Sequence, residues 1–291
     1  MVKSSYQSGR GFWRFMAFEI ERYAFRKRWL LVLPLALFLA YIVSGTVLVY
    51  SDNNHLAGNT WDILFSVFGN GNIVFYVLNL FLLFLVSDLS LETKFGEWVL
   101  LRLCSRKQWW IGKMLLLAMS VLFYLAILVL VIAAVSSFVL PWQGTWSEKA
   151  IGNPLEAFLT PQMTAISPLS VFLQLLILLT FGWFSLGLTT MVFARLFNHA
   201  LAGFSLGMFV NICGILALKG SLVDMPYPYN LLFIDTHLLI NLHNFGKSPS
   251  PYPSFFASIL YWVGWIALFG VWGFAFGSRK DFLPPQHHPD E

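Results

Sequence analysis

The sequence predicts an all-α polytopic membrane protein with six transmembrane helices, and three observations lead to this fold class. Of the 291 residues, 58% are hydrophobic, and the mean hydropathy is +0.70. Only 11% are charged, whereas soluble domains carry about 25%. The apolar residues gather in six long runs, and nearly all of the charge lies between them. A chain of this kind places most of its length in lipid.

Residues 1–28 are predicted to form an N-terminal cytoplasmic segment with an interfacial (elbow) helix over 12–28. On a helix of about 100° per residue, its apolar side chains fall within about 120° of one another. This face consists of Phe12, Trp13, Met16, Ile20, Tyr23 and Ala24. The pattern favours a helix that packs along the bundle, and the simpler alternative is a basic anchor that only fixes topology.

Residues 29–277 are predicted to form the membrane domain, and residues 278–291 a cytoplasmic tail. The six runs cover 29–50, 73–86, 111–140, 169–193, 200–222 and 255–277. The second is shorter than the ~20 residues that a spanning helix needs. It must therefore be extended, by Gly71 and Asn72 on one side or by 87–91 on the other.

The basic residues predict the orientation. Of the 18 Lys and Arg residues, all except Lys149, Lys219 and Lys247 lie on one side of this arrangement. Cytoplasmic loops carry the excess of Lys and Arg, so we expect a multi-pass plasma-membrane protein with both termini in the cytoplasm. Cys104 and Cys213 lie at different depths, which argues against a disulfide framework. The orientation also accounts for the basic balance without a nucleic-acid partner.

Two outer segments are distinctive. Residues 141–167 are rich in Pro, Gly and Trp and predict an irregular cap. Residues 231–242 are mostly apolar but too few to span a bilayer, so they predict a re-entrant hairpin between the fifth and sixth spans. An ordinary loop is the alternative for this second segment.

Catalytic and cofactor motifs are weak. Gly246, Lys247 and Ser248 resemble the end of a phosphate-binding loop, but that pattern requires Gly at the position of Asn241. The runs carry no charged residue near their centres, whereas ion-coupled carriers need intramembrane ionisable groups. We therefore expect no enzyme activity and no cofactor in this chain, and an external source of energy.

A metal site on the outer side is a further alternative. Asp235, His237 and His243 could contribute ligands, but their spacing matches no strong zinc pattern. A solvated or interfacial loop is the favoured interpretation of these residues, and we expect no metal site.

The fifth run carries a face of small residues. Gly203, Gly207, Asn211 and Gly214 recur at helical spacing on one side. Small residues let helices approach closely in lipid, and an Asn side chain can form a hydrogen bond across the contact. The face predicts packing, either within one bundle or at a seam between two subunits.

The charged segment 88–113 separates the second and third runs and reads DLSLETKFGEWVLLRLCSRKQWWIGK. Residues 88–103 are compatible with a helix, and a break at Cys104 and Ser105 precedes a basic, aromatic stretch at the inner interface. Lys113 is expected to snorkel from the first turn of the third span. The apolar side chains of this segment favour burial against lipid or a partner over a solvated connector.

At this segment the chain resembles the ABC-2 family of ABC-transporter permeases. The resemblance lies in Glu92, Gly96, the Leu100-Leu101 pair, the Ser105-Arg106 pair and Lys113, and it extends to the elbow helix and the six-span plan. The family often has Pro where this chain has Cys104. The resemblance implies a dimer of this chain with a second copy or a paralogue. It also implies a separate cytoplasmic ATPase subunit, which binds ATP and Mg.

The resemblance further implies that the cytoplasmic segment is a coupling helix between spans two and three. The expected coupling residues are Glu92, Phe95, Gly96, Glu97, Trp98, Leu101, Arg102, Ser105 and Arg106. The predicted function is the permease subunit of an exporter of amphipathic substrates such as peptides, antibiotics or lipid-linked molecules. The alternatives are a stand-alone immunity or sensory membrane protein and, less favoured by the motifs, a membrane-embedded enzyme.

Overall fold

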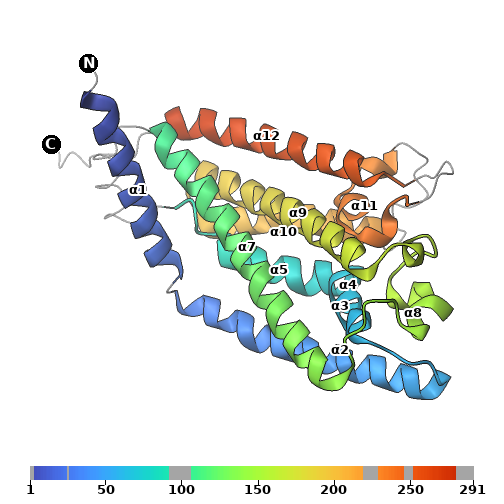
Figure 1. Ribbon diagram of the computed structural model, residues 1–291. Coiled ribbons are helices and arrows are strands. Elements are labelled where there is room, and N and C mark those ends of the chain that lie inside the picture. The colour runs from blue at the N-terminus through green and yellow to red at the C-terminus, as the bar shows by residue number, and fades with distance from the viewer. Residues whose placement is uncertain (1–2, 25, 92–105, 219–228, 246–251, 280–291) are drawn as a thin grey trace.

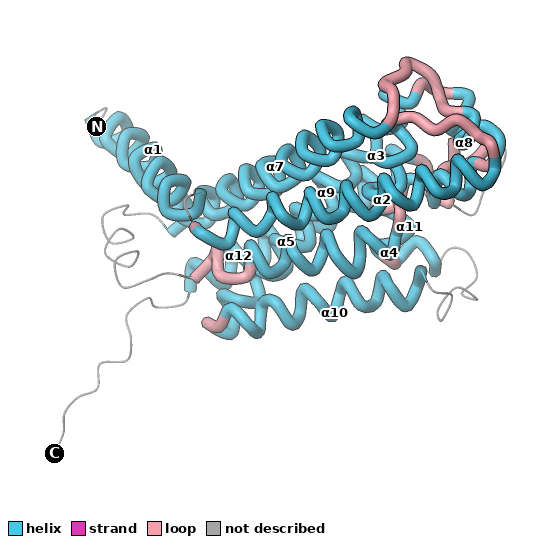
Figure 2. The backbone as a smooth tube through the Cα atoms, turned by 90° about the horizontal axis from the view of Figure 1, so that it is seen from below, coloured by secondary structure: helices cyan, strands magenta, loops and turns pink. Residues whose placement is uncertain are grey.

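The computed structural model describes residues 3–24, 26–91, 106–218, 229–245 and 252–279, and this part of the chain is a helical bundle without strands (Figures 1 and 2). Five helices are long and apolar enough to span a membrane, which identifies a polytopic membrane protein. They are α2 (Val32–Asn54, preceded by the 3-10 helix η1, Lys27–Leu31), α7 (Arg106–Val139), α9 (Pro168–Phe197), α10 (Ala200–Leu218) and α12 (Phe255–Arg279).

A bent pair of helices lies where the second span was predicted. Helix α3 (Thr60–Phe68) meets α4 (Gly71–Ile73), the π-helical turn η2 (Val74–Leu78) and α5 (Asn79–Val86) at 51°. In Figure 1, α5 reaches the end of the bundle where α7 begins. Counted as one broken span, the pair raises the number of spans to six.

The sequence prediction covered only the second half of this pair. At the bend, the backbone N–H of Gly69 donates to Phe65 O, and the Asn70 side chain accepts from the backbone N–H of Asn72, so one helix ends as the next begins. Polar Asp62 and Ser66 interrupt the hydropathy of α3, although both are buried. This is why 60–68 did not stand out as apolar in the sequence.

The N-terminal helix α1 (Lys3–Ala24) contacts α7 and extends away from the end of the bundle (Figures 1 and 2). The predicted apolar face is rotated from the buried one. Phe15, Met16, Glu19 and Tyr23 are buried, whereas Trp13 is 69% exposed. Glu19 lies in the middle of the buried stripe, so its partner decides how this helix packs.

The outer segments are short helices and turns. Residues 141–167 contain α8 (Glu148–Gly152), η3 (Pro154–Ala157) and η4 (Met163–Ala165). Residues 231–242 form no continuous helix but η5 (Tyr229–Leu232), α11 (Ile234–Leu238) and η6 (Ile240–Leu242). All residues of 234–240 are buried, and α11 contacts α9, α10 and α12. This part of the outer segment is therefore built into the bundle.

Candidate functional site

The charged segment 88–113 is described only at its two ends. Of the expected coupling residues, Glu92, Phe95, Gly96, Glu97, Trp98, Leu101, Arg102 and Ser105 lie outside the described residues. Arg106 is the first residue of α7 and is exposed. The contacts at the two ends therefore define how the segment is attached.

The first end, at Asp88, is held by the N-terminal part of the chain. The Asp88 carboxylate accepts from the guanidinium groups of Arg26 and Arg28. The Tyr23 hydroxyl lies 3.1 Å from the backbone oxygens of both Asp88 and Leu89. Charge-assisted hydrogen bonds are stronger than neutral ones, so the junction of α1 and η1 fixes where the segment leaves the bundle.

The same end is also attached to the bundle interior. The buried Ser90 hydroxyl donates to the backbone oxygen of Met191 in α9 at 2.9 Å. Asp88 and Ser90 are only two residues apart, so this short stretch joins α1, η1 and α9. The sequence prediction named neither residue as a contact.

The second end, at Lys113, is held by α1 through a buried ion pair. Lys113 Nζ donates to Glu19 Oε2 at 2.6 Å, and the two side chains are 0% and 1% exposed. Arg22 contacts the other Glu19 oxygen at 3.4 Å. The expectation that Lys113 snorkels to the interface is therefore wrong, because a carboxylate from α1 neutralises it inside the protein.

Aromatic side chains pack around this second end. Trp109 and Trp110 are buried, and the Trp110 indole N–H donates to the backbone oxygen of Gly270 in α12 at 3.1 Å. A Cβ added to Gly112 would lie 2.6 Å from the Phe15 ring, so α1 and α7 are in close contact here. The first turns of α7 thus connect α1 to α12.

The small face of α10 lies against other helices of the same chain. Added Cβ atoms would lie 2.5 Å from Ala194 Cβ at Gly203, 2.3 Å from Thr190 Oγ1 at Gly207 and 2.8 Å from the Phe75 ring at Gly214. Residues 190 and 194 belong to α9 and residue 75 to η2. These contacts are the intramolecular alternative of the two that the sequence left open.

Asn211 on this face belongs to a buried hydrogen-bond network beside the π-helical turn. The Asn79 amide donates to Asn211 Oδ1, and the Trp183 indole donates to Asn79 Oδ1, both at 2.7 Å. Asn211 Nδ2 donates to the backbone oxygen of Phe75 at 2.9 Å. The Tyr124 hydroxyl donates to the backbone oxygen of Leu78 at 3.1 Å. Polar side chains of α7 and α10 thus bind backbone oxygens of η2.

The outer histidines form a second polar cluster. Both rings contact the Ser258 hydroxyl of α12, His237 through Nδ1 at 2.9 Å and His243 through Nε2 at 2.8 Å. Their other ring nitrogens lie 2.8 Å from Leu231 O and 2.9 Å from Leu239 O. A backbone oxygen can only accept, so the ring nitrogens that face Leu231 O and Leu239 O must carry the hydrogens. His237 Nδ1 and His243 Nε2 then both face the Ser258 hydroxyl with a lone pair, and this hydroxyl can donate a hydrogen bond to only one of them.

Burial shifts the pKa values of three titratable side chains in and beside this cluster. Burial lowers the pKa of His237, and it lowers that of His243 to about 4. Burial also raises the pKa of Asp235 to about 6. The Asp235 Oδ1 atom has no hydrogen-bond partner within the described part of the chain. In that part of the chain no group of three His, Cys, Asp or Glu is placed to hold a metal ion.

Another buried charge joins the cap to α3. Asp62 accepts from the Ser147 hydroxyl at 2.8 Å and from the Asn59 backbone N–H at 2.7 Å. Lys149 lies 4.7 Å from the centre of the Tyr50 ring, and burial lowers the pKa of its ammonium group. These contacts fix the outer cap to α2 and α3, and sequence reasoning missed them because the partners are far apart in the chain.

Comparison with known proteins does not place the chain in a family. No family model, no curated protein and no solved structure matches it. The functional argument therefore depends on the residues and contacts described above.

Proposed function

We propose that the chain is the permease subunit of an ABC-type exporter, which forms the translocation path as a dimer and is driven by a separate cytoplasmic ATPase. The membrane-spanning helices supply the setting for this role. The observation that carries the proposal is the attachment of segment 88–113 at both ends. Asp88 pairs with Arg26 and Arg28, and Lys113 pairs with Glu19, so both ends contact the N-terminal part of the chain.

These attachments suit a segment that transmits force. A load applied by a partner between residues 88 and 113 reaches α1 through the Lys113–Glu19 pair, and the stretch that follows α1 through the ion pairs of Asp88. The second connection is buried and continues through Trp110 to α12. A solvated connector needs no such attachments, so they favour the coupling role over the alternative of a plain loop.

The orientation of the chain is part of the proposal. In Figure 1 the first helix α1 and the end of α12 lie at the same end of the bundle, as six crossings require. With the basic residues on the cytoplasmic side, both termini and the segment 88–113 face the cytoplasm of a plasma-membrane protein. ATP and Mg then bind in the partner ATPase, and the exported substrate is amphipathic, such as a peptide, an antibiotic or a lipid-linked molecule.

Purification from native membranes in mild detergent tests this function. We expect a subunit with ATPase activity to co-purify. The charge reversals Glu92→Arg and Arg106→Glu should lower its recovery about tenfold, because a lost charged contact costs about 1–3 kcal/mol. Asp52→Arg is the matched control, since Asp52 is exposed in the last turn of α2, and this end of α2 lies far from α1 in Figure 1.

Two results would count against the coupling assignment. Equal recovery of the ATPase with both reversals would show that the segment is a connector. Absence of any ATPase, together with a stable and active lone chain, would favour the stand-alone immunity or sensory role instead.

A further inference from the structure

Two imidazole rings and one hydroxyl group meet in the part of the bundle around α11, at the end opposite α1 (Figure 1). His237 belongs to α11, His243 directly follows η6, and Ser258 lies near the start of α12. The three side chains are 3%, 2% and 0% exposed. Their polar atoms therefore depend on one another and on nearby backbone groups for hydrogen bonds, and we call them the His–Ser–His triad.

The triad is one hydrogen short when both rings are neutral. The ring hydrogens lie on His237 Nε2 and His243 Nδ1, because each of these atoms contacts a backbone oxygen, at 2.8 and 2.9 Å. The other ring nitrogens lie 2.9 and 2.8 Å from Ser258 Oγ. The hydroxyl donates to only one of them, so in the remaining contact two lone pairs face each other, which is unfavourable.

One additional proton converts that contact into a hydrogen bond. The protonated ring donates to Ser258 Oγ, and the Ser258 hydroxyl donates to the other ring. Every polar atom of the triad then has a partner, and a hydrogen bond from a charged donor is stronger than a neutral one. Because the hydroxyl can turn either way, either ring can hold the charge.

The titratable side chains around the triad are few in the described part of the chain. Tyr261 of α12 stacks on the His237 ring with the ring centres 3.9 Å apart, and Asp235 of α11 precedes His237 by two residues. Of the other long helices that contact α11, α10 carries only Cys213 and α9 only Arg195, in its last turn. The hydrogen bonds of the two rings thus go to Ser258 and to backbone oxygens, and none goes to these side chains.

We propose that the His–Ser–His triad binds one proton, which the two imidazoles share through the Ser258 hydroxyl. Burial opposes this proton, because it lowers the pKa of both rings, so the triad takes up the proton on acidification. Both rings are then held by Ser258, whereas only one is held at higher pH. The Trp262 indole, which does not titrate, donates to His237 O at 3.1 Å and keeps α11 attached to α12 at both pH values. The proposal does not depend on the transport function.

Nuclear magnetic resonance of the purified full chain, with nitrogen-15 in its six His residues, tests the triad by titration from pH 8 to pH 4. The ring nitrogens report imidazole protonation directly, so the titration of Asp235, with its pKa of about 6, does not interfere. In the wild-type chain the signals of the two triad rings should shift together, because one proton belongs to the pair. The variants His243→Gln and His237→Asn identify the signals of each ring.

Removing one ring should lower the pKa of the other. In His243→Gln, the amide can donate to Ser258 Oγ while the hydroxyl donates to His237, so an added proton supplies no missing hydrogen bond. The pKa of His237 should then lie at least about one pH unit below that of the wild-type triad, a shift equivalent to one hydrogen bond. His237→Asn should have the same effect on His243.

Independent titration of the two rings in the wild-type chain would overturn the proposal. So would an unchanged or raised pKa of the remaining ring in the single variants, which is the result expected if the rings only repel each other as cations.

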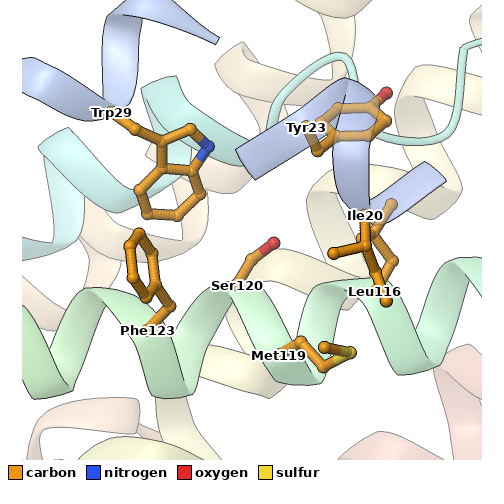
Figure 3. Close-up of a pocket in the computed structure, with 7 residues that line it drawn as sticks. All are labelled: Ile20, Tyr23, Trp29, Leu116, Met119, Ser120 and Phe123. Carbon is orange, nitrogen blue, oxygen red and sulfur yellow. The ribbon is translucent and has the colours of Figure 1, made fainter. Parts of the chain in front are cut away.

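Ser258→Ala removes the shared hydroxyl and should also lower the pKa of the first proton. Ser120→Ala is the matched control and should leave the titration unchanged. Ser120 is buried as well, but it lies in a cavity of about 140 Å³ between α1, η1 and α7, and none of the seven lining residues is a histidine (Figure 3). An unaltered titration in a folded Ser258→Ala chain would refute the shared proton. If that chain does not fold, the single-ring variants decide.

Discussion

Separating Lys113 from Glu19 should destabilise the protein more than any surface substitution on the same helix. Lys113→Met keeps the length of the side chain but leaves the Glu19 carboxylate, 1% exposed, with Arg22 at 3.4 Å as its remaining ion-pair contact. Glu19→Leu instead removes the carboxylate that Lys113 Nζ contacts at 2.6 Å. Removing one partner of a buried ion pair costs about 3–5 kcal/mol.

The double variant should recover much of that loss. With both charges replaced, no uncompensated charge stays buried, and a well-packed apolar pair is about as stable as a buried ion pair. The coupling energy from the double-mutant cycle should therefore be at least ~2 kcal/mol, near the upper part of the range for residues in contact. Lys107→Met is the matched control, because Lys107 is exposed on the same helix, and surface substitutions stay within about 0.5 kcal/mol.

Thermal and denaturant unfolding in mild detergent measure these differences. If Lys113→Met and Glu19→Leu are each as stable as Lys107→Met, the pair does not hold α1 against α7. Strictly additive effects in the double variant would equally refute the reasoning, because they would mean that the two side chains do not interact.

Three further predictions concern other parts of the molecule. Burial raises the pKa of Asp235 from 3.8 to about 6, so the folded state binds this proton more tightly than the unfolded state. The contribution of Asp235 to stability is then highest below pH 3.8 and falls as the pH rises through 6. Asp235→Asn should thus stabilise the protein by about 3 kcal/mol at pH 8 and not at pH 3.5; an equal shift of the unfolding temperature at both pH values would contradict this. Gly207→Leu should lower stability strongly, because even a Cβ at this position would lie 2.3 Å from Thr190 Oγ1. Leu206→Ala, at a half-buried position, should have a smaller effect. Similar unfolding midpoints for the two variants would exclude close packing at this face. Labelling of single cysteines on intact cells with an impermeant thiol reagent, in a chain without Cys104 and Cys213, tests the orientation. A cysteine at position 155, where Leu155 is 75% exposed, should be labelled, and one at position 107 should not. The reverse pattern would show that the predicted orientation is wrong.

The spanning helices could be predicted from the sequence because their signal is local. A long run of apolar residues predicts a membrane span without any knowledge of which helices pack against it. The runs 169–193 and 200–222 correspond to α9 and to the described part of α10. The spacing of Gly203, Gly207 and Gly214 is equally local, and it identified the face on which these residues lie. Whether that face packs within one subunit required the positions of α9 and η2.

The contacts of the charged segment could not be predicted, because each depends on a distant partner. Glu19 and Lys113 are 94 residues apart, and nothing near Glu19 in the sequence marks it as buried. The helical wheel of α1 placed Trp13 on the buried face, since it ranks residues by hydrophobicity alone. Burial of Glu19 becomes favourable only when α7 brings Lys113 to it. The coupling residues 92–105 stay a prediction because they lie outside the described part of the chain.

The hydrogen-bond network around Asn79 determines which parts of the molecule can move independently. It links α5, α7, α9 and α10, and in a membrane any helix that slid past its neighbours would leave amide or backbone groups unsatisfied in hydrocarbon. These four helices should therefore shift as one rigid body. Helix α12 packs against this body and is hydrogen-bonded to it through the Trp110 and Trp265 indoles, and α1 is joined to it by the Glu19–Lys113 pair and by close packing at Gly112. A large rearrangement of the protein would then leave this four-helix block intact and change how α1, α2 and α12 pack against it.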